Sequence, residues 1–244
     1  MARGPLLTLL LLLMTLKAPA QTPVPPDSGR QGAGQNTTQR DPIHYPRQSF
    51  PPHQALAHLQ AGNLAWTRRL PDSETPLAPL PRPGGAGRYL AAVVTCCDSP
   101  VDTAELFACR RQDLLIISTP GANVDATVTA TLERLASAER LSLCVIVTHA
   151  NCPCLEAGQP DSPAGRALQL RTKMAIDLAR TRRCTVEEAQ ARLQRDHLLG
   201  SSRMLRELRD KGRLRIAPAS LPLRHLPLRW HATRAAAAPI APVK

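Results

Sequence analysis

Two segments of the chain end in side chains that bind metal ions. Residues 93–99 read VVTCCDS and contain Cys96, and residues 145–152 read VIVTHANC and contain His149 and Cys152. Each segment begins with an apolar, β-branched run that predicts a buried strand. Because the carboxyl ends of neighbouring parallel strands meet at one crevice, we expect the three side chains to lie together there.

Two thiolates and one imidazole are ligands that suit Zn²⁺. Three protein ligands leave the fourth tetrahedral position to water, which is typical of catalytic rather than structural zinc. We therefore expect Cys96, His149 and Cys152 to hold one zinc ion per chain. The alternative for the two thiols is oxidation to disulfides, and the alternative for His149 is an ordinary place at a strand end.

The elements that would position these ligands follow from the apolar periodicity. Strands are expected at 90–95, 114–117, 143–148 and 214–217, and helices at 51–69, 124–138, 164–178, 186–199 and 201–211, with Thr185 and Glu188 forming a capping box. Strands that alternate with helices predict an α/β fold with a mostly parallel central sheet that is flanked by helices.

Five segments between about Gln54 and Leu223 resemble the β-class carbonic anhydrases in the order of that family's motifs. The C-x-D-S-R segment is similar to residues 96–100, H-x-x-C to 149–152, R-N-A-G-N to 118–122, A-L-x-x-L-x-x-G-N to 55–63, and the closing G-x-L-x-I/V strand to 212–216. The order and spacing of the five carry the resemblance, because each one alone is weak.

The resemblance implies reversible hydration of CO₂ to bicarbonate by a zinc-bound hydroxide. It also implies a homodimer formed through the N-terminal helix. In the family, the Asp of C-x-D-S-R pairs with the following Arg and accepts a hydrogen bond from the hydroxide. Asp98 occupies that position, which makes it the expected catalytic residue.

The chain departs from the family where Pro100 replaces the motif Arg, and only Gly121 is kept in the R-N-A-G-N loop. An Asp98 without a cationic partner has the option of becoming the fourth zinc ligand, and a closed site is not hydrolytic. Arg110 or Arg111 could supply the cation instead. The alternatives are therefore an active carbonic anhydrase, whose turnover is weak without the Arg, and a non-catalytic zinc-binding relative.

The chain is basic, with a formal net charge of +12, which suggests a third alternative. A basic surface-interaction module that uses the fold only as a scaffold would attract polyanions. Nucleic acid is not expected as a partner, because aromatic residues make up only 2% of the chain and do not interleave with the basic ones.

The N-terminal 20 residues have the features of a signal peptide. Arg3 precedes an apolar run that ends in Ala18-Pro19-Ala20, a small-x-small cleavage site. We expect an exported protein, periplasmic or secreted, with no membrane span after removal of the signal. A disordered linker is expected at 21–50, the folded domain at 51–223 and an irregular tail at 224–244.

The odd number of cysteines, seven, argues against a framework made only of disulfides. Cys97 and Cys154 alternate with the expected ligands and are expected to point away from the metal, as core residues or as thiols of a second site. The other three are expected to be small buried apolar side chains; they are Cys109, Cys144 and Cys184.

Overall fold

The computed structural model describes residues 50–68, 89–156 and 161–232. All of them lie in one compact unit. The expected signal peptide and all of the expected linker except Phe50 fall outside the described residues. Within the described ranges, no helix has the length and apolar character needed to cross a membrane.

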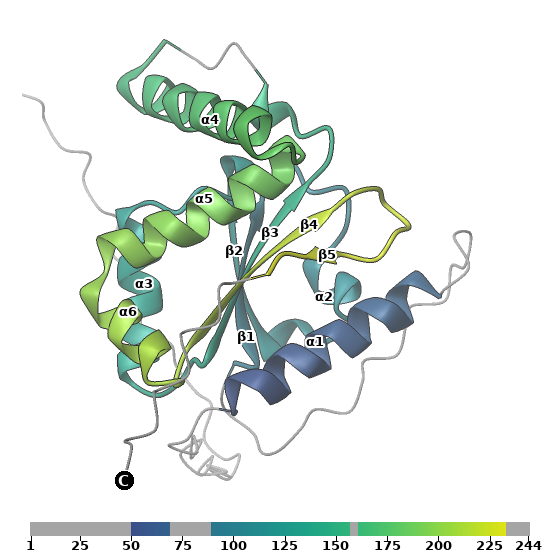
Figure 1. The fold of residues 1–244 in the computed structure, drawn as a ribbon. Helices are drawn as coiled ribbons and strands as arrows, with labels where there is room; N and C mark the ends of the chain where they lie inside the picture. The colour runs from purple at the N-terminus through teal and green to yellow at the C-terminus, as the bar shows by residue number, and fades with distance from the viewer. Residues whose placement is uncertain (1–49, 69–88, 157–160, 233–244) are drawn as a thin grey trace, which may run out of the picture. The chain divides into compact units, whose positions relative to one another are not determined.

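A five-stranded sheet forms the centre of this unit (Figure 1). Its strands are β1 (Ala91–Cys96), β2 (Leu114–Thr119), β3 (Leu143–His149), β4 (Arg215–Leu221) and β5 (Arg229–Trp230). They lie in the order β2-β1-β3-β4-β5. The first four are parallel, and β5 is antiparallel to β4. The expected α/β fold with a mostly parallel sheet is confirmed.

Helices cover both faces of the sheet (Figure 1). They are α1 (Pro52–Thr67), α2 (Thr103–Leu106), α3 (Ala126–Ser137), α4 (Pro163–Arg182), α5 (Val186–Ser201) and α6 (Arg203–Asp210). One core cluster joins α1 and α2 to the sheet, and the other joins α3, α5 and α6 to its opposite face. The long helix α4 packs on α5. Because both faces are covered, β1 and β3 are buried along their whole length, which is why they read as continuous apolar runs.

Helix α5 begins where the sequence places its cap. The Thr185 hydroxyl accepts a hydrogen bond from the Glu188 N–H at 3.3 Å. The Glu188 carboxylate does not complete the expected capping box; it accepts hydrogen bonds from the guanidinium of Arg192 instead. The glutamate at the third helical position is therefore paired with an arginine one turn along the same helix rather than with the helix end.

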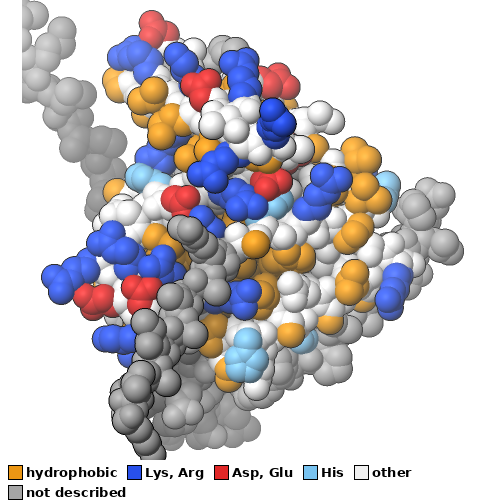
Figure 2. Space-filling view, viewed as in Figure 1, with side chains coloured by type: hydrophobic (Ala, Val, Ile, Leu, Met, Phe, Trp, Pro, Cys, Tyr) orange, Lys and Arg blue, Asp and Glu red, His pale blue; other side chains and the backbone are white. Residues whose placement is uncertain are grey.

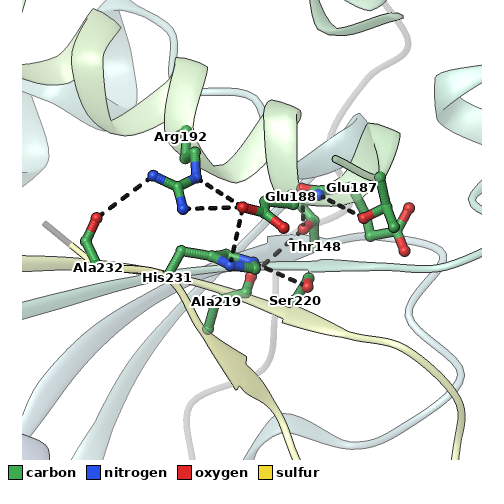
Figure 3. Close-up of polar contacts among 9 residues, drawn as sticks. Thr148, Glu187, Glu188, Arg192, Ala219, Ser220, His231 and Ala232 are labelled. Carbon is green, nitrogen blue, oxygen red and sulfur yellow. Dashed lines mark hydrogen bonds and ion pairs between the residues drawn. The ribbon is translucent and has the colours of Figure 1, made fainter. Parts of the chain in front are cut away.

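The same Glu188 carboxylate also approaches His231 and so helps to fasten β5, which lies in the stretch expected to be irregular (Figure 3). His231 Nε2 lies 3.0 Å from Ser220 Oγ of β4, and its Nδ1 lies 3.6 Å from Glu188 Oε1. The Leu228 N–H also donates to the buried side chain of Asn63 in α1 at 2.8 Å. The expectation of an irregular tail is therefore wrong for this part, because two residues are too few to produce a periodic pattern in the sequence.

Candidate metal centre

The carboxyl ends of β1 and β3 bring the three expected ligands together. The two strands are parallel neighbours with Thr95 opposite Val147, so Cys96 and His149 both lie at the same edge of the sheet. Cys152 follows three residues after β3. One ligand atom from each of Cys96, His149 and Cys152 lies within 4.8 Å of the other two, and all three side chains are buried.

The sulfur of Cys96 is the centre of a hydrogen-bond cluster. It lies 3.4 Å from the sulfur of Cys152 and accepts the backbone N–H groups of Gly121 at 3.3 Å and of Asp98 at 3.4 Å. The hydrogen bond from Cys152 is the main cause that lowers the pKa of Cys96 to about 3, against the effect of burial. The same hydrogen bond raises the pKa of Cys152. Cys96 is therefore the first thiol of the pair to become a thiolate, and thiolates are the form that binds metal.

The imidazole of His149 has a hydrogen-bond partner at only one of its two nitrogens among the described residues. Its Nδ1 lies 3.0 Å from the carbonyl oxygen of Ala150, which fixes the ring proton on that nitrogen. Its Nε2 is buried and has no hydrogen-bond partner among the described residues. A buried polar atom without a partner costs about 1–3 kcal/mol. A metal ion bound by Nε2 and the two sulfurs would satisfy it, so the donor set fits zinc.

The loop that donates to Cys96 is held in an unusual backbone conformation. Gly121 has φ +63°, and a Cβ at this position would approach Leu155 Cδ2 at 3.0 Å, so only glycine fits without strain. Two glutamines of α5 form hydrogen bonds with the backbone of this loop. Gln190 Nε2 donates to the Gly121 carbonyl at 2.9 Å, and Gln194 Oε1 accepts from the Val124 N–H at 2.8 Å.

Sequence analysis does not identify either glutamine as part of the site. Gln190 is 0% exposed and Gln194 is 2% exposed. The available signal is their spacing of four residues on the face of the helix that also carries buried alanine and leucine. Such a polar pair on an apolar helix face indicates a specific buried partner.

Asp98 lies beside the three ligands but outside their group. Its side chain is exposed, and its carboxylate does not lie within 4.8 Å of all three ligand atoms. It lines a pocket of about 300 Å³ together with Pro100, His149 and Arg224. This arrangement places Asp98 at the mouth of the candidate metal centre, where it can accept hydrogen bonds from a small ligand.

The two arginines named as substitutes for the motif Arg are engaged elsewhere. Arg110 Nε lies 3.2 Å from Asp113, and Arg111 lies 3.8 Å from Asp102. The cation that does line the pocket is Arg224, from the loop after β4. Sequence analysis misses Arg224 because it lies in a proline-rich stretch beyond the last expected strand.

Cys97 and Cys154 do not join the group of Cys96, His149 and Cys152, but, against expectation, they do not point away from Cys96. The sulfur atoms of Cys96, Cys97 and Cys154 all lie within 4.8 Å of one another. Cys109 and Cys144 are buried as expected, whereas Cys184 is only half-buried. All seven cysteines lie in described ranges, and none forms a disulfide.

Comparison with known proteins identifies the fold. No protein-family model and no curated protein matches the chain. Among solved structures, a tetrameric β-carbonic anhydrase of Sordaria macrospora matches with a TM-score of 0.50 at 14% identity, over 59% of this chain and 81% of that one. The β-carbonic anhydrase CafD of Aspergillus fumigatus matches with a TM-score of 0.48 at 17% identity, over 68% and 96%. A Coccomyxa β-carbonic anhydrase in complex with acetazolamide matches with a TM-score of 0.48 at 14% identity, over 73% and 82%.

The chain therefore has the fold of the β-class carbonic anhydrases, in a divergent form. At identities this low the match establishes only the fold. The chemistry of the site has to be inferred from the residues of this chain.

Proposed function

We propose that the protein is a zinc-dependent carbonic anhydrase that hydrates CO₂ reversibly to bicarbonate. The observation that carries the proposal is the convergence of Cys96, His149 and Cys152, with a buried Nε2 that lacks a hydrogen-bond partner among the described residues. Three ligands from this donor set are typical of a catalytic zinc site. The convergence of these three residues supports the proposal.

Zinc at such a site supplies a nucleophile near neutral pH, because it lowers the pKa of water to about 7. The chain's own groups prepare the ligands for it. Two backbone N–H groups donate to the Cys96 sulfur, which favours its thiolate form, and the Ala150 carbonyl fixes the tautomer of His149. Outer hydrogen bonds of this kind orient metal ligands and sustain metal affinity.

Asp98 and Arg224 supply the acidic and the basic group of the adjacent pocket, whose lining also includes the apolar side chains of Pro100, Leu221 and Leu223. A small apolar substrate suits such a lining. We propose that Asp98 accepts a hydrogen bond from the attacking group and that Arg224 provides the cation that keeps the carboxylate off the metal. Arg224 is exposed and lines the same pocket as Asp98.

The non-catalytic zinc-binding relative remains the second candidate because Pro100 cannot pair with Asp98. The third candidate, a basic surface-interaction module, has less support. Over α4 and α6 the basic side chains are mixed with acidic ones (Figure 2), and pairs such as Arg180–Asp177 and Arg203–Glu207 join them. A mixed surface does not form the single-sign patch that attracts polyanions strongly.

Three measurements on the purified protein separate the three candidates. Metal analysis is expected to give one zinc per chain, and stopped-flow CO₂ hydration is expected to give turnover that Cys152→Ser abolishes. Bound zinc without turnover at any pH would favour the non-catalytic relative. Absence of zinc, together with salt-dependent binding of a polyanion such as heparin, would favour the interaction module.

We also propose that the protein is exported and forms a homodimer, as the sequence predicts. In α1 the side chains of Ala55, Leu56 and Leu59 are buried against the chain's own sheet, whereas Leu64 is 48% exposed and available to a second copy. Light scattering after gel filtration tests the dimer.

N-terminal sequencing of the natural protein tests the cleavage before Gln21, and an intact Met1 would contradict it.

A further inference from the structure

A second group of thiols lies next to the candidate zinc centre. The sulfur atoms of Cys96, Cys97 and Cys154 lie within 4.8 Å of one another, and no His, Asp or Glu of the described residues joins them. Cys96 is common to both groups. The proposed zinc function accounts for Cys96 and Cys152 but gives no task to Cys97 or Cys154.

Three sulfur atoms without an oxygen or nitrogen ligand favour a soft cation. Thiolates select Cu(I), zinc and iron–sulfur centres over the harder divalent ions. Zinc takes four ligands, and its structural sites are closed by four protein side chains. Cu(I) is saturated by three thiolates, so a group that offers only three sulfurs suits Cu(I) better than a second zinc.

The position of the two additional thiols also suits the capture of an ion from solution. Cys97 is exposed and Cys154 is half-buried, whereas Cys96 and Cys152 are buried. Cys154 packs at the edge of the small core cluster formed by Cys96, Cys152 and Leu155. The second group therefore opens to the surface on one side and meets the candidate zinc centre on the other.

We propose that Cys96, Cys97 and Cys154 form a second metal site that binds Cu(I), with the Cys96 sulfur shared between this ion and the zinc. The proposal rests on the proposed zinc site only for the shared ligand. Because Cys96 is already a thiolate in the zinc site, Cu(I) replaces only the protons of Cys97 and Cys154, and neither metal changes its oxidation state.

Two cysteines of the same loop provide crossed variants for the test. The full-length protein, reduced and zinc-loaded without oxygen, is titrated with Cu(I) buffered by bathocuproine disulfonate, and both metals are counted after gel filtration. Wild type is expected to hold one zinc and one copper. Cys154→Ser is expected to keep zinc and lose copper, whereas Cys152→Ser is expected to lose zinc and keep copper. X-ray absorption at the copper edge is expected to show sulfur neighbours only.

Further variants make each outcome decisive. Cys97→Ser, at an exposed position that does not burden folding, is expected to lose copper like Cys154→Ser. Cys184→Ser, a half-buried thiol outside both groups, is the control that retains both metals. Copper binding at the wild-type level in both Cys97→Ser and Cys154→Ser would overturn the second site. Replacement of zinc by copper one for one would overturn it as well. A wild-type protein that binds copper but no zinc would instead contradict the proposed function and leave the second site standing.

Discussion

The sulfur atoms of Cys96 and Cys152 lie 3.4 Å apart, although 56 residues separate them in the sequence. A disulfide would bring them to about 2.05 Å. Two sulfurs bound to one tetrahedral zinc at about 2.3 Å each stand about 3.8 Å apart. The observed spacing is therefore close to that of two ligands of one metal ion, and it arises because β1 and β3 end at the same edge of the sheet.

We predict one zinc per chain and a sharp loss of zinc in Cys152→Ser, because a hydroxyl is a far poorer zinc ligand than a thiolate. Metal content is measured on protein prepared with limiting zinc. The matched control is Cys184→Ser, which changes a half-buried thiol outside the site. Full zinc occupancy in both Cys96→Ser and Cys152→Ser would contradict the assignment.

A second prediction concerns the helix that braces the metal loop. Gln190→Leu removes the donor to the Gly121 carbonyl, and Gly121 in turn donates to the Cys96 sulfur. We expect zinc affinity to fall about tenfold, as is typical when a residue behind a metal ligand is lost. The loss of stability is limited to about 1 kcal/mol, because the substitution also removes the buried Gln190 Oε1, which has no partner among the described residues.

Gln194→Leu is the comparison for this prediction. It deprives the Val124 N–H of its acceptor, three residues further along the loop, without touching Gly121. Stability is expected to fall by about 1–3 kcal/mol, with a smaller effect on zinc. Chemical denaturation and a competitive zinc chelator measure the two quantities. Equal zinc affinities in the two variants would show that Gly121 does not transmit the effect of Gln190.

The ligands and the main elements are predictable from the sequence because they depend on local patterns. The runs before Cys96 and His149 are apolar and β-branched, and parallel strands of one sheet end at a common edge. The supports of the site depend on contacts between distant segments, which no local pattern encodes. Gln190 reaches Gly121 across 69 residues, and Arg224 enters the pocket only because the chain turns back after β4 to form β5. The closeness of Cys97 and Cys154 to Cys96 is not predictable from the sequence either, because the alternation of side chains along a strand does not continue into the turn that follows it.

A third prediction concerns pH and the contact that fastens β5. Burial is the main cause that lowers the pKa of His231, with Arg192 and Arg229 acting in the same direction against Glu188 and Glu187. The folded state thus keeps this imidazole neutral where the unfolded chain, with a pKa of about 6.5, takes up a proton. The contribution of His231 is fully present above about pH 6.5 and is lost as the pH falls toward the lowered value.

The wild-type protein is therefore expected to lose stability more steeply below pH 6.5 than His231→Gln, in which this group no longer titrates. Denaturant unfolding at several pH values between about 5 and 8 measures the difference. His225→Gln, at an exposed position on the loop before β5, serves as the matched control. Parallel pH profiles for wild type and His231→Gln would show that the buried imidazole does not control this dependence.

The last prediction concerns the positive charge that the motif Arg would place beside Asp98 and that Pro100 does not supply. Arg224 lines the same pocket as Asp98, whereas the exposed Arg229 on β5 does not line it. If Arg224 holds the carboxylate away from the zinc, Arg224→Ala is expected to lower CO₂ hydration about tenfold, which corresponds to about 1.4 kcal/mol. Zinc content should stay unchanged, and Arg229→Ala should retain the wild-type rate.

Pro100→Arg in the Arg224→Ala background then tests whether position 100 can supply the same charge. An arginine there can form bidentate hydrogen bonds with the Asp98 carboxylate and compete with the metal for it, whereas proline offers neither charge nor N–H. We expect the double variant to recover most of the lost turnover, and Pro100→Gln in the same background to recover none, since glutamine has length without charge. Stopped-flow hydration of zinc-loaded proteins across pH provides the comparison. Equal rates for Arg224→Ala and wild type would remove Arg224 from the mechanism, and recovery with glutamine would show that shape rather than charge at position 100 limits the reaction.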